Sequence, residues 1–316
     1  MNPAFSVIFF TVVSGTGYGL LFLLGIMLAF DPSSLGRNEA LLALGVGATF
    51  VVAGLLSSTL HLGQPQRAWR ALSQWRSSWL SREGVASLAS FVPIFALAWC
   101  LWRSADEALL RGLGALLAVL AIITVACTAR IYTCLKTIPA WHNAYVLPGY
   151  LLLGALGGAC WSWLIGEWIG GARAQPTLIV TLAIASSALK FAYWRFIDTS
   201  PPTSTPESAT GLGRFGRVRS VEAPHTEENY LTQEMGFVLA RKHAGRLRAI
   251  CLGLIGAIPV LLAMAMLFSP LAANAIFACI AALSVTAGLF VERWLFFAEA
   301  KHVVMLYYGG AQTQRA

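Results

Sequence analysis

The sequence predicts an all-α integral membrane protein, built as a bundle of eight transmembrane helices. Of its 316 residues, 57% are hydrophobic and only 11% are charged, and the mean hydropathy is +0.69. Soluble globular domains carry about 25% charged residues, so this composition excludes a soluble enzyme and a disordered protein. The net charge of +8 would also suit a nucleic-acid binder. Membrane topology accounts for the basic residues, however, and we expect no nucleic-acid partner.

Eight apolar runs are long enough to cross a bilayer, which takes about 20 apolar residues in a helix. In chain order they are Phe5–Phe30, Ala40–Leu60, Val85–Trp102, Gly112–Cys127, Val146–Ile165, Thr177–Phe196, Ile250–Phe268 and Ala273–Phe296. The apolar part of the fourth run is short, and we expect its helix to continue to about Tyr132. The first run is too long for a signal-peptide core and lacks a basic segment in front, so we expect it to remain as a helix. Residues 1–316 are therefore expected to form a single membrane domain.

Lysine and arginine gather on one side of the predicted bundle. Eight spans place both termini on the same side, and 17 of the 22 basic residues fall on that side. Four fall on the opposite side, and Lys190 lies inside the sixth span. Because positive residues favour the cytoplasmic side, we expect both termini to be cytoplasmic. The protein is then a multi-pass protein of the bacterial inner membrane, with lipid head groups as partners of its surplus charge.

A long cytoplasmic segment, residues 199–248, is expected between the sixth and seventh spans. Thr199–His225 is rich in Pro, Ser, Thr, Gly and Arg, which is typical of an irregular loop. Glu227–Arg248 has apolar residues at helical spacing, which indicates an amphipathic helix at the membrane interface. Both a docking site for a soluble partner and a plain interfacial helix fit this pattern.

The cysteines and histidines do not form the patterns of a metal centre. The six cysteines form no C-x-x-C pair, whereas zinc and iron–sulfur sites need clustered thiolates. We therefore expect no metal and no iron–sulfur cluster in this protein. All five histidines lie on the side of the termini. His61 and His302 could pair as axial ligands of one haem, but no second pair exists at the opposite face, so we expect no haem.

The segment between the second and third spans carries the most informative polar residues. His61 ends the second span and Glu83 begins the third, so two antiparallel helices bring them to a similar membrane depth. An ionisable pair at the edge of the hydrocarbon suggests function. A quinol head group exchanges two protons along with its electrons, and a histidine and a carboxylate can relay them. A structural interpretation also remains, because a carboxylate in the first turn of a helix is stabilised by the helix dipole.

Further ionisable residues are predicted on the same side. Lys190 lies about 10 Å inside the end of its span, at 1.5 Å per residue. From there it either snorkels to the interface or pairs with Glu292. One stripe of the last helix holds Glu292, Phe296 and Glu299, and the fourth span is followed by Arg130, Tyr132 and His142. Any redox site is therefore expected to open toward the cytoplasmic leaflet.

Five motifs in order along the sequence resemble the membrane anchor subunit of dimethyl sulfoxide (DMSO) reductase-type complexes. They are FTVVSGTGYGLLFL, LHLGQPQRAWRAL, SREGVAS, ARIYTCLKTIPAW and VERWLFFAEAKHVV. The resemblance implies a haem-free subunit that holds a molybdopterin catalytic subunit and a four-cluster iron–sulfur subunit at the membrane. It also implies electron exchange with a quinone, either ubiquinone or menaquinone.

The resemblance also implies which residues bind the quinone. In that family a histidine at the position of His61 and a glutamate at the position of Glu83 are implicated in quinol binding, and Arg67 matches as well. We expect a quinone site formed by His61, Arg67, Glu83, Arg130 and Tyr132, with His61 and Glu83 as the catalytic residues.

Two features depart from the shorter enterobacterial pattern of this family. They are the loop 199–248 and an orientation that places the His61–Glu83 connection inside, with the partner subunits on the cytoplasmic side. That orientation suits the branch resembling anchors of cytoplasmic sulfite dehydrogenases, which oxidise sulfite and reduce quinone. The alternatives are the anchor of a quinol-oxidising sulfoxide or N-oxide reductase, a purely structural tether, and a secondary transporter. A transporter would need an internal repeat and a polar site at the bilayer midplane, and the sequence indicates neither.

Overall fold

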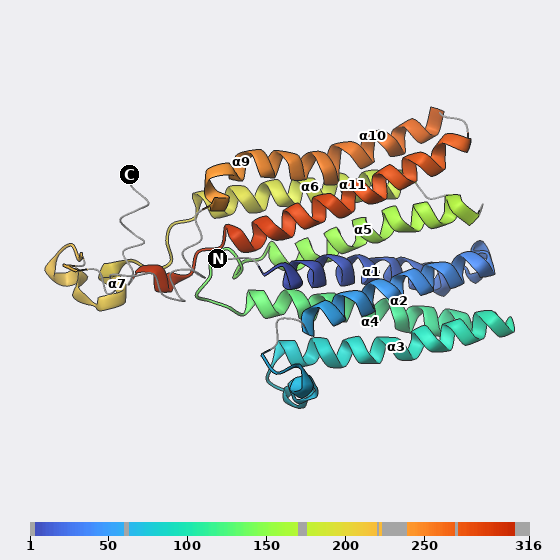
Figure 1. Ribbon diagram of the computed structural model, residues 1–316, viewed down its shortest axis with the longest axis horizontal. Coiled ribbons are helices and arrows are strands. Elements are labelled where there is room, and N and C mark those ends of the chain that lie inside the picture. Colours follow the sequence, from blue (N-terminus) through green and yellow to red (C-terminus); the bar gives the residue numbers. More distant parts are fainter. Residues whose placement is uncertain are drawn as a thin grey trace.

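The computed structural model describes residues 4–59, 63–169, 176–219, 221–222, 239–268 and 271–306 of the protein. Within these ranges the protein is all-helical and contains no strand. Eight helical segments of the described ranges are long and apolar enough to cross a membrane. The predicted fold class is therefore confirmed. Figure 1 shows these segments as one elongated bundle with their axes side by side.

The spans match the predicted apolar runs, and most extend a few residues beyond them. In chain order they are α1 (Phe5–Phe30), α2 (Arg37–Thr59), α3 (Trp79–Arg103), α4 (Glu107–Thr133), α5 (Val146–Ile169), α6 (Pro176–Thr199), a seventh built from α9 (Leu239–Leu252), η4 (Gly253–Ala257) and α10 (Ile258–Ala265), and α11 (Leu271–Ala298). The fourth span continues to Thr133, as predicted from the short apolar part of its sequence.

The first helix organises half of the bundle, because α1 packs against α2, α4 and α5. A Cβ atom on Gly19 would lie 1.8 Å from the carbonyl oxygen of Gly154 on α5, and one on Gly25 would lie 2.6 Å from that of Gly114 on α4. Small residues allow helix backbones in a membrane to approach this closely. The position of α4 is thereby fixed, and α3 packs against α4.

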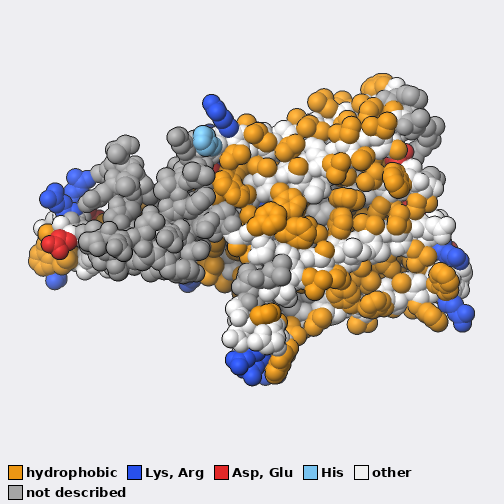
Figure 2. Space-filling view, in the orientation of Figure 1, with side chains coloured by type: hydrophobic (Ala, Val, Ile, Leu, Met, Phe, Trp, Pro, Cys, Tyr) orange, Lys and Arg blue, Asp and Glu red, His pale blue; other side chains and the backbone are white. Residues whose placement is uncertain are grey.

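One end of the bundle carries the longer connections, and we call it the loop end (left in Figure 1). It holds the start of α1, the start of α3, the end of α11 and three further segments, η2 (Pro65–Gln74), the connection 134–145 and α7 (Pro206–Thr210). In Figure 2, hydrophobic side chains cover the long flanks of the bundle, and the visible lysine and arginine side chains lie toward its ends. This distribution is that of a protein whose flanks face lipid.

The seventh span contains a π-helical turn, η4, where it packs closely against α11. A Cβ atom on Gly288 of α11 would lie 2.8 Å from the Cβ atom of Leu254. The Ser284 hydroxyl on α11 donates a hydrogen bond of 3.0 Å to the Leu254 carbonyl. A π-turn disturbs the regular helical hydrogen bonds, and here a neighbouring hydroxyl supplies a donor to one of the carbonyls.

The described part of the segment 199–248 contains short helices where an irregular loop was expected. It contains α7, whose Thr205 cap exchanges hydrogen bonds with Ser208, and the short helix η3 (Leu212–Phe215). Part of the predicted amphipathic helix, residues 227–238, lies outside the described residues. From Leu239 the backbone is helical and runs on into the seventh span, so the last part of that predicted helix extends the span.

Candidate functional site

Glu83 is a buried carboxylate at the loop end, in the second turn of α3. The α3 helix begins after Ser78, whose hydroxyl caps the first turn by accepting from the Ser81 amide at 3.4 Å. Only 4% of Glu83 is exposed, and its carboxylate accepts a hydrogen bond from the Thr128 hydroxyl on α4. Among the described residues, no basic side chain forms an ion pair with Glu83. A buried carboxylate without such a partner is costly, which points to a functional role.

A polar stripe continues along α3 from Glu83 toward the centre of the bundle. Ser87 and Ser90 follow at helical spacing, and both are fully buried. The hydroxyl groups of Tyr18 on α1 and Ser87 form a hydrogen bond of 2.7 Å, and the Ser90 hydroxyl lies 3.3 Å from the Tyr18 hydroxyl. The face of α3 that carries these residues, which Tyr18 reaches from α1, is therefore polar for two turns beyond Glu83.

The helix η2 lies across the start of α3, and Arg67 is one of its residues. In Figure 1, η2 is seen nearly end-on, so its axis crosses that of α3. The Ser81 hydroxyl donates to the Ala71 carbonyl of η2, and Leu72 of η2 lies over Gly84, where a Cβ atom would be 2.7 Å from its methyl group. Arg67 itself is exposed. The sequence pattern led us to expect a plain connection here, although its alternation of apolar and basic residues is typical of an interfacial helix.

Two arginines flank Trp79 at the first residue of α3. The Arg82 guanidinium carbon lies 4.2 Å from the centre of the Trp79 ring, and that of Arg130, near the end of α4, lies 5.8 Å from it. Arg82 also donates to the carbonyls of Trp75 and Arg76, at 3.0 Å and 2.7 Å. Arg130 is exposed, so these arginines form a positive rim at the loop end of α3 and α4.

Tyr132 lies in an aromatic cluster between α4, α5 and α11. Its ring centre is 5.3 Å from that of Trp141, 5.9 Å from that of Tyr150 and 5.5 Å from that of Phe296. The Trp141 indole donates a 2.9 Å hydrogen bond to the Phe296 carbonyl. The contacts found for Tyr132 are thus aromatic and belong to the core of the bundle.

The predicted site residues therefore differ in how the structure places them. Glu83 is buried at the loop end, Arg130 lies near it on the adjoining rim, and Arg67 is exposed on η2. Tyr132 belongs to the aromatic cluster. His61 lies outside the described residues, so the predicted pairing of His61 with Glu83 stays a prediction.

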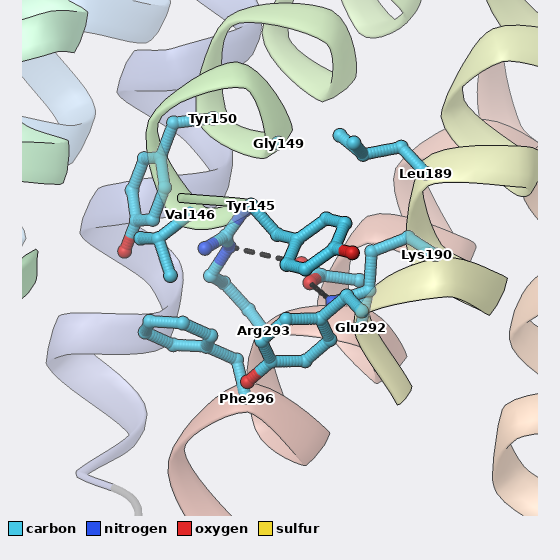
Figure 3. A pocket seen from close by; sticks show the side chains of 10 residues that line it. Tyr145, Val146, Gly149, Tyr150, Leu189, Lys190, Glu292, Arg293 and Phe296 are labelled. Carbon is cyan, nitrogen blue, oxygen red and sulfur yellow. Dashed lines mark ion pairs between the residues drawn. The ribbon is translucent and has the colours of Figure 1, made fainter. Parts of the chain in front are cut away.

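A second polar cluster joins α6 to α11, as shown in Figure 3. Lys190 Nζ lies 2.6 Å from Glu292 Oε1, and Arg293 Nε lies 3.1 Å from Glu292 Oε2. The three side chains are buried. Of the two outcomes predicted for Lys190, pairing with Glu292 is the correct one. The small cavity beside these residues has room for about one water molecule.

Aromatic rings surround the two cations of this cluster. Lys190 Nζ lies 3.9 Å from the centre of the Tyr193 ring, and the Arg293 guanidinium carbon lies 3.9 Å from that of the Tyr150 ring. Contacts between cations and aromatic faces strengthen as they are removed from water. Its two cations share one carboxylate and lie against aromatic rings, so the cluster ties α5, α6 and α11 together.

Arg248 ties three helices together closer to the loop end. It donates to Asp198 on α6 from Nη1 at 2.5 Å and from Nη2 at 3.0 Å. It also donates from Nε to Glu299, just after α11, at 2.9 Å. Burial raises the pKa of the Glu299 carboxyl, although Arg248 opposes that shift. This bidentate arrangement fixes the start of the seventh span against its neighbours.

Two residues of these clusters, Thr128 and Arg293, were not predicted from the sequence. Thr128 is one of three threonines in the apolar helix α4, a type of residue that usually bonds to its own backbone. Arg293 follows Glu292 directly, and from the sequence alone it was counted with the basic residues near the C-terminus. Its position beside Tyr150 depends on how α5 and α11 pack, which local spacing does not reveal.

Within the described ranges, no three His, Cys, Asp or Glu side chains come together in a way that could hold a metal ion. The five cysteines at positions 100, 127, 160, 251 and 279 lie within the spans, while Cys134 is exposed at the loop end. Around Glu83 the structure brings together a buried carboxylate, hydroxyl groups and a rim of arginines.

Comparison with known proteins identifies the family. The sequence matches the family described as DMSO reductase anchor subunit (DmsC) over residues 1–309. The protein belongs to this family. One relative, the C subunit of sulfite dehydrogenase from Allochromatium vinosum, is 33% identical over 327 aligned residues, which cover 98% of this protein and 99% of the relative. Another, the C subunit of anaerobic dimethyl sulfoxide reductase from Escherichia coli, is 28% identical over 142 residues, covering 43% of this protein and 49% of that relative.

Membership of the DmsC family confirms the resemblance found in the sequence motifs. As an anchor subunit with eight helices, among its described residues, that are long and apolar enough to span a membrane, the protein is a multi-pass membrane protein. It is the membrane anchor of a molybdoenzyme and associates with catalytic and iron–sulfur subunits.

Proposed function

We propose that this protein exchanges electrons between an iron–sulfur partner subunit and the quinone pool, with Glu83 at the quinone site. The observation that carries the proposal is the burial of Glu83 beside the Thr128 hydroxyl, with no ion-pair partner among the described residues. A quinone takes up two protons when two electrons reduce it to a quinol. A buried carboxyl group at the membrane edge can give or take such a proton.

The contacts of Thr128 suit a carboxyl group that changes its protonation state. Its hydroxyl lies within hydrogen-bonding distance of both the Glu83 carboxylate and the Thr124 carbonyl, the latter at 3.1 Å. A hydroxyl group has one hydrogen to donate. When Glu83 is ionised, Thr128 donates to it; when Glu83 is protonated, Glu83 donates to Thr128, which turns to the Thr124 carbonyl. Both states of Glu83 then keep a hydrogen bond.

His61 and Arg67 are proposed to complete the head-group site. His61 follows α2 by two residues, and a histidine can exchange the second proton near neutral pH. Arg67 belongs to η2, which lies against the start of α3 through Ser81 and Gly84. Arg130 is proposed to add positive charge at the rim, which would favour a quinone that is gaining electrons. Tyr132 is proposed to support this end through its aromatic contacts.

We propose sulfite oxidation with quinone reduction as the reaction of the complex. The sulfite dehydrogenase relative matches nearly the full length of this protein, whereas the dimethyl sulfoxide reductase relative matches less than half of it. The loop end is proposed to face the cytoplasm of a bacterial cell, because 17 of 22 basic residues fall on that side of the eight spans. A four-cluster iron–sulfur subunit and a molybdopterin subunit would then dock at the loop end.

Metal analysis of the complex tests the assembly. A copy with an affinity tag at its carboxyl end, purified from mild-detergent membranes, is expected to bring molybdenum or tungsten together with iron equivalent to about four clusters. The same preparation is then assayed with sulfite and with dimethyl sulfoxide. A protein that purifies without metal and without partners would contradict the proposed assembly.

Glu83→Gln tests the quinone site. The variant is expected to assemble normally and to lose quinone-coupled turnover, while electron transfer from the catalytic subunit to a soluble dye persists. Glu107→Gln is the matched control, because Glu107 is exposed at the opposite end of the bundle, where it pairs with Arg111. Normal quinone turnover in Glu83→Gln would instead favour a purely structural tether.

A further inference from the structure

An apolar groove opens on the flank of the bundle between α2 and α3. Its volume is about 390 Å³, within the range of small-molecule sites. The α2 side contributes Ala48, Ala53 and Leu56, and the α3 side contributes Phe91, Ile94 and Phe95. Ile94 is buried, whereas Phe95 is 70% and Leu56 63% exposed. The groove thus has a closed floor and rims that are open to the surrounding lipid.

The composition of the two helices explains why a groove forms here. The opposite face of α2 packs tightly on α1, where a Cβ atom on Gly54 would lie 2.8 Å from the Cβ atom of Ser14. The face of α2 toward α3 carries the small side chains of Ala48 and Ala53, which leave space. On α3 the rings of Phe91 and Phe95, with centres 6.1 Å apart, form the opposite wall.

The floor of the groove continues the polar stripe of α3. Glu83, Ser87, Ser90 and Ile94 follow one another at spacings of four, three and four residues, which places them on one face of a helix. Phe91 is eight residues beyond Glu83, or about 12 Å deeper in the membrane at 1.5 Å per residue. On α2, Leu56 lies three residues before the end of the helix at Thr59, with His61 two residues further in the sequence.

The groove therefore lies in an apolar region of the membrane, and Leu56 and Phe91 are its lining residues nearest the polar residues of the loop end. There η2 lies over α3, with Leu72 packed on Gly84. A ligand that fits this arrangement has a small polar head and a long apolar tail. It also has to enter from the bilayer, because the rims of the groove face lipid.

We propose that this groove holds the isoprenoid tail of the quinone, with the head group at Glu83. This inference rests on the proposed function and adds the part of the site that binds the tail. A phospholipid fits less well, since its charged phosphate would have to be buried beside Glu83, which is only 4% exposed. The head group of a quinone is uncharged and can form hydrogen bonds with the carboxyl group of Glu83.

The test compares a quinone that has a long isoprenoid tail with the same ring lacking the tail. In the whole complex, Ala53→Phe fills the groove and is expected to raise the KM for the long-tailed quinone roughly tenfold, the loss expected for about two buried methylene groups. The KM for the tail-less quinone is expected to stay unchanged. Quinone extracted from the purified complex is expected to fall in the same variant, which gives a readout independent of turnover.

Val92→Phe is the matched control, because Val92 is a lipid-exposed residue of α3 that does not line the groove. Phe95→Ala is a second groove variant, in which an exposed side chain is shortened without disturbing the core. It is expected to raise the KM for the long-tailed quinone alone, by a smaller factor. This variant keeps the test decisive if Ala53→Phe does not assemble.

The outcomes separate this inference from the proposed function. Equal KM values for the long-tailed quinone in Ala53→Phe, Phe95→Ala and Val92→Phe would overturn the tail site, while the effect of Glu83→Gln would still test the head-group site. An equal rise in the KM for both quinones would also overturn the tail site, since the effect would then not depend on the tail. A wild-type complex that reacts with neither quinone would overturn both proposals.

Discussion

Lys190 on α6 and Glu292 on α11 form an ion pair inside the membrane domain, with Nζ and Oε1 2.6 Å apart and both side chains buried. Arg293 contacts the second carboxylate oxygen of Glu292 at 3.1 Å. One carboxylate is thus shared by two cations, and each cation lies against a tyrosine ring. The second half of the bundle is held together by charge as well as by apolar packing.

Lys190→Met is expected to destabilise the anchor, because it removes the partner of one oxygen of a buried carboxylate. Removing one member of a buried pair costs about 3–5 kcal/mol of stability. Because Glu292 keeps its contact with Arg293, we expect a loss of unfolding free energy at the lower end of this range. The thermal unfolding midpoint of the complex in detergent measures the effect. Lys136→Met is the control, since Lys136 is exposed in the connection after α4. Equal midpoints in the two variants would show that the pair adds no stability.

Thr128→Val is expected to slow quinone turnover without preventing assembly. The variant keeps the shape of the side chain and removes the hydroxyl that contacts Glu83. A hydrogen bond to a charged group contributes about 1.5–3 kcal/mol, so we expect kcat/KM for quinone to fall roughly 10- to 100-fold. Thr128→Ser restores the hydroxyl and should recover most of the rate. A shift in the pH profile of Thr128→Val would distinguish an effect on Glu83 from a change in packing.

Gly19→Ala is expected to disrupt the contact between α1 and α5, because its methyl group would lie 1.8 Å from the Gly154 carbonyl oxygen. The two backbones would have to separate, and overpacking of this kind typically costs about 1–3 kcal/mol or more. Gly15→Ala on the same helix is the control, since its methyl group meets no atom within 4 Å. The yield of assembled complex and its thermal midpoint should fall only for Gly19→Ala. Similar behaviour of the two variants would contradict the close packing of α1.

The sequence was sufficient to predict the eight spans, because the length of an apolar run is a local property set by bilayer thickness. For Lys190 it left two outcomes open, snorkelling to the interface or pairing with Glu292, and the structure shows the pairing. The sequence did not predict the contact of Thr128 with Glu83 or of Arg293 with Tyr150. Those contacts depend on the rotation of neighbouring helices about their axes, which is set by close backbone packing such as that of α1 on α5.

The proposed orientation predicts the side from which Cys134 can be labelled. Cys134 is an exposed cysteine in the connection after α4 at the loop end, and the cysteines at positions 100, 127, 160 and 251 are buried. A membrane-impermeant maleimide is therefore expected to label the protein in inverted membrane vesicles and to leave it unlabelled in intact spheroplasts. Cys134→Ser should abolish the signal, which identifies the labelled site.

Ser33→Cys, made in the Cys134→Ser background, supplies the opposite test. Ser33 is exposed in η1 (Pro32–Ser34), between α1 and α2 at the far end of the bundle. Its cysteine is expected to react in spheroplasts and to be protected in inverted vesicles. The reverse pattern at both positions would place the loop end outside the cytoplasm. The Glu83 site would then lie in the outer leaflet, and the partner subunits would dock outside the cytoplasm. That result would favour the sulfoxide reductase alternative over sulfite oxidation.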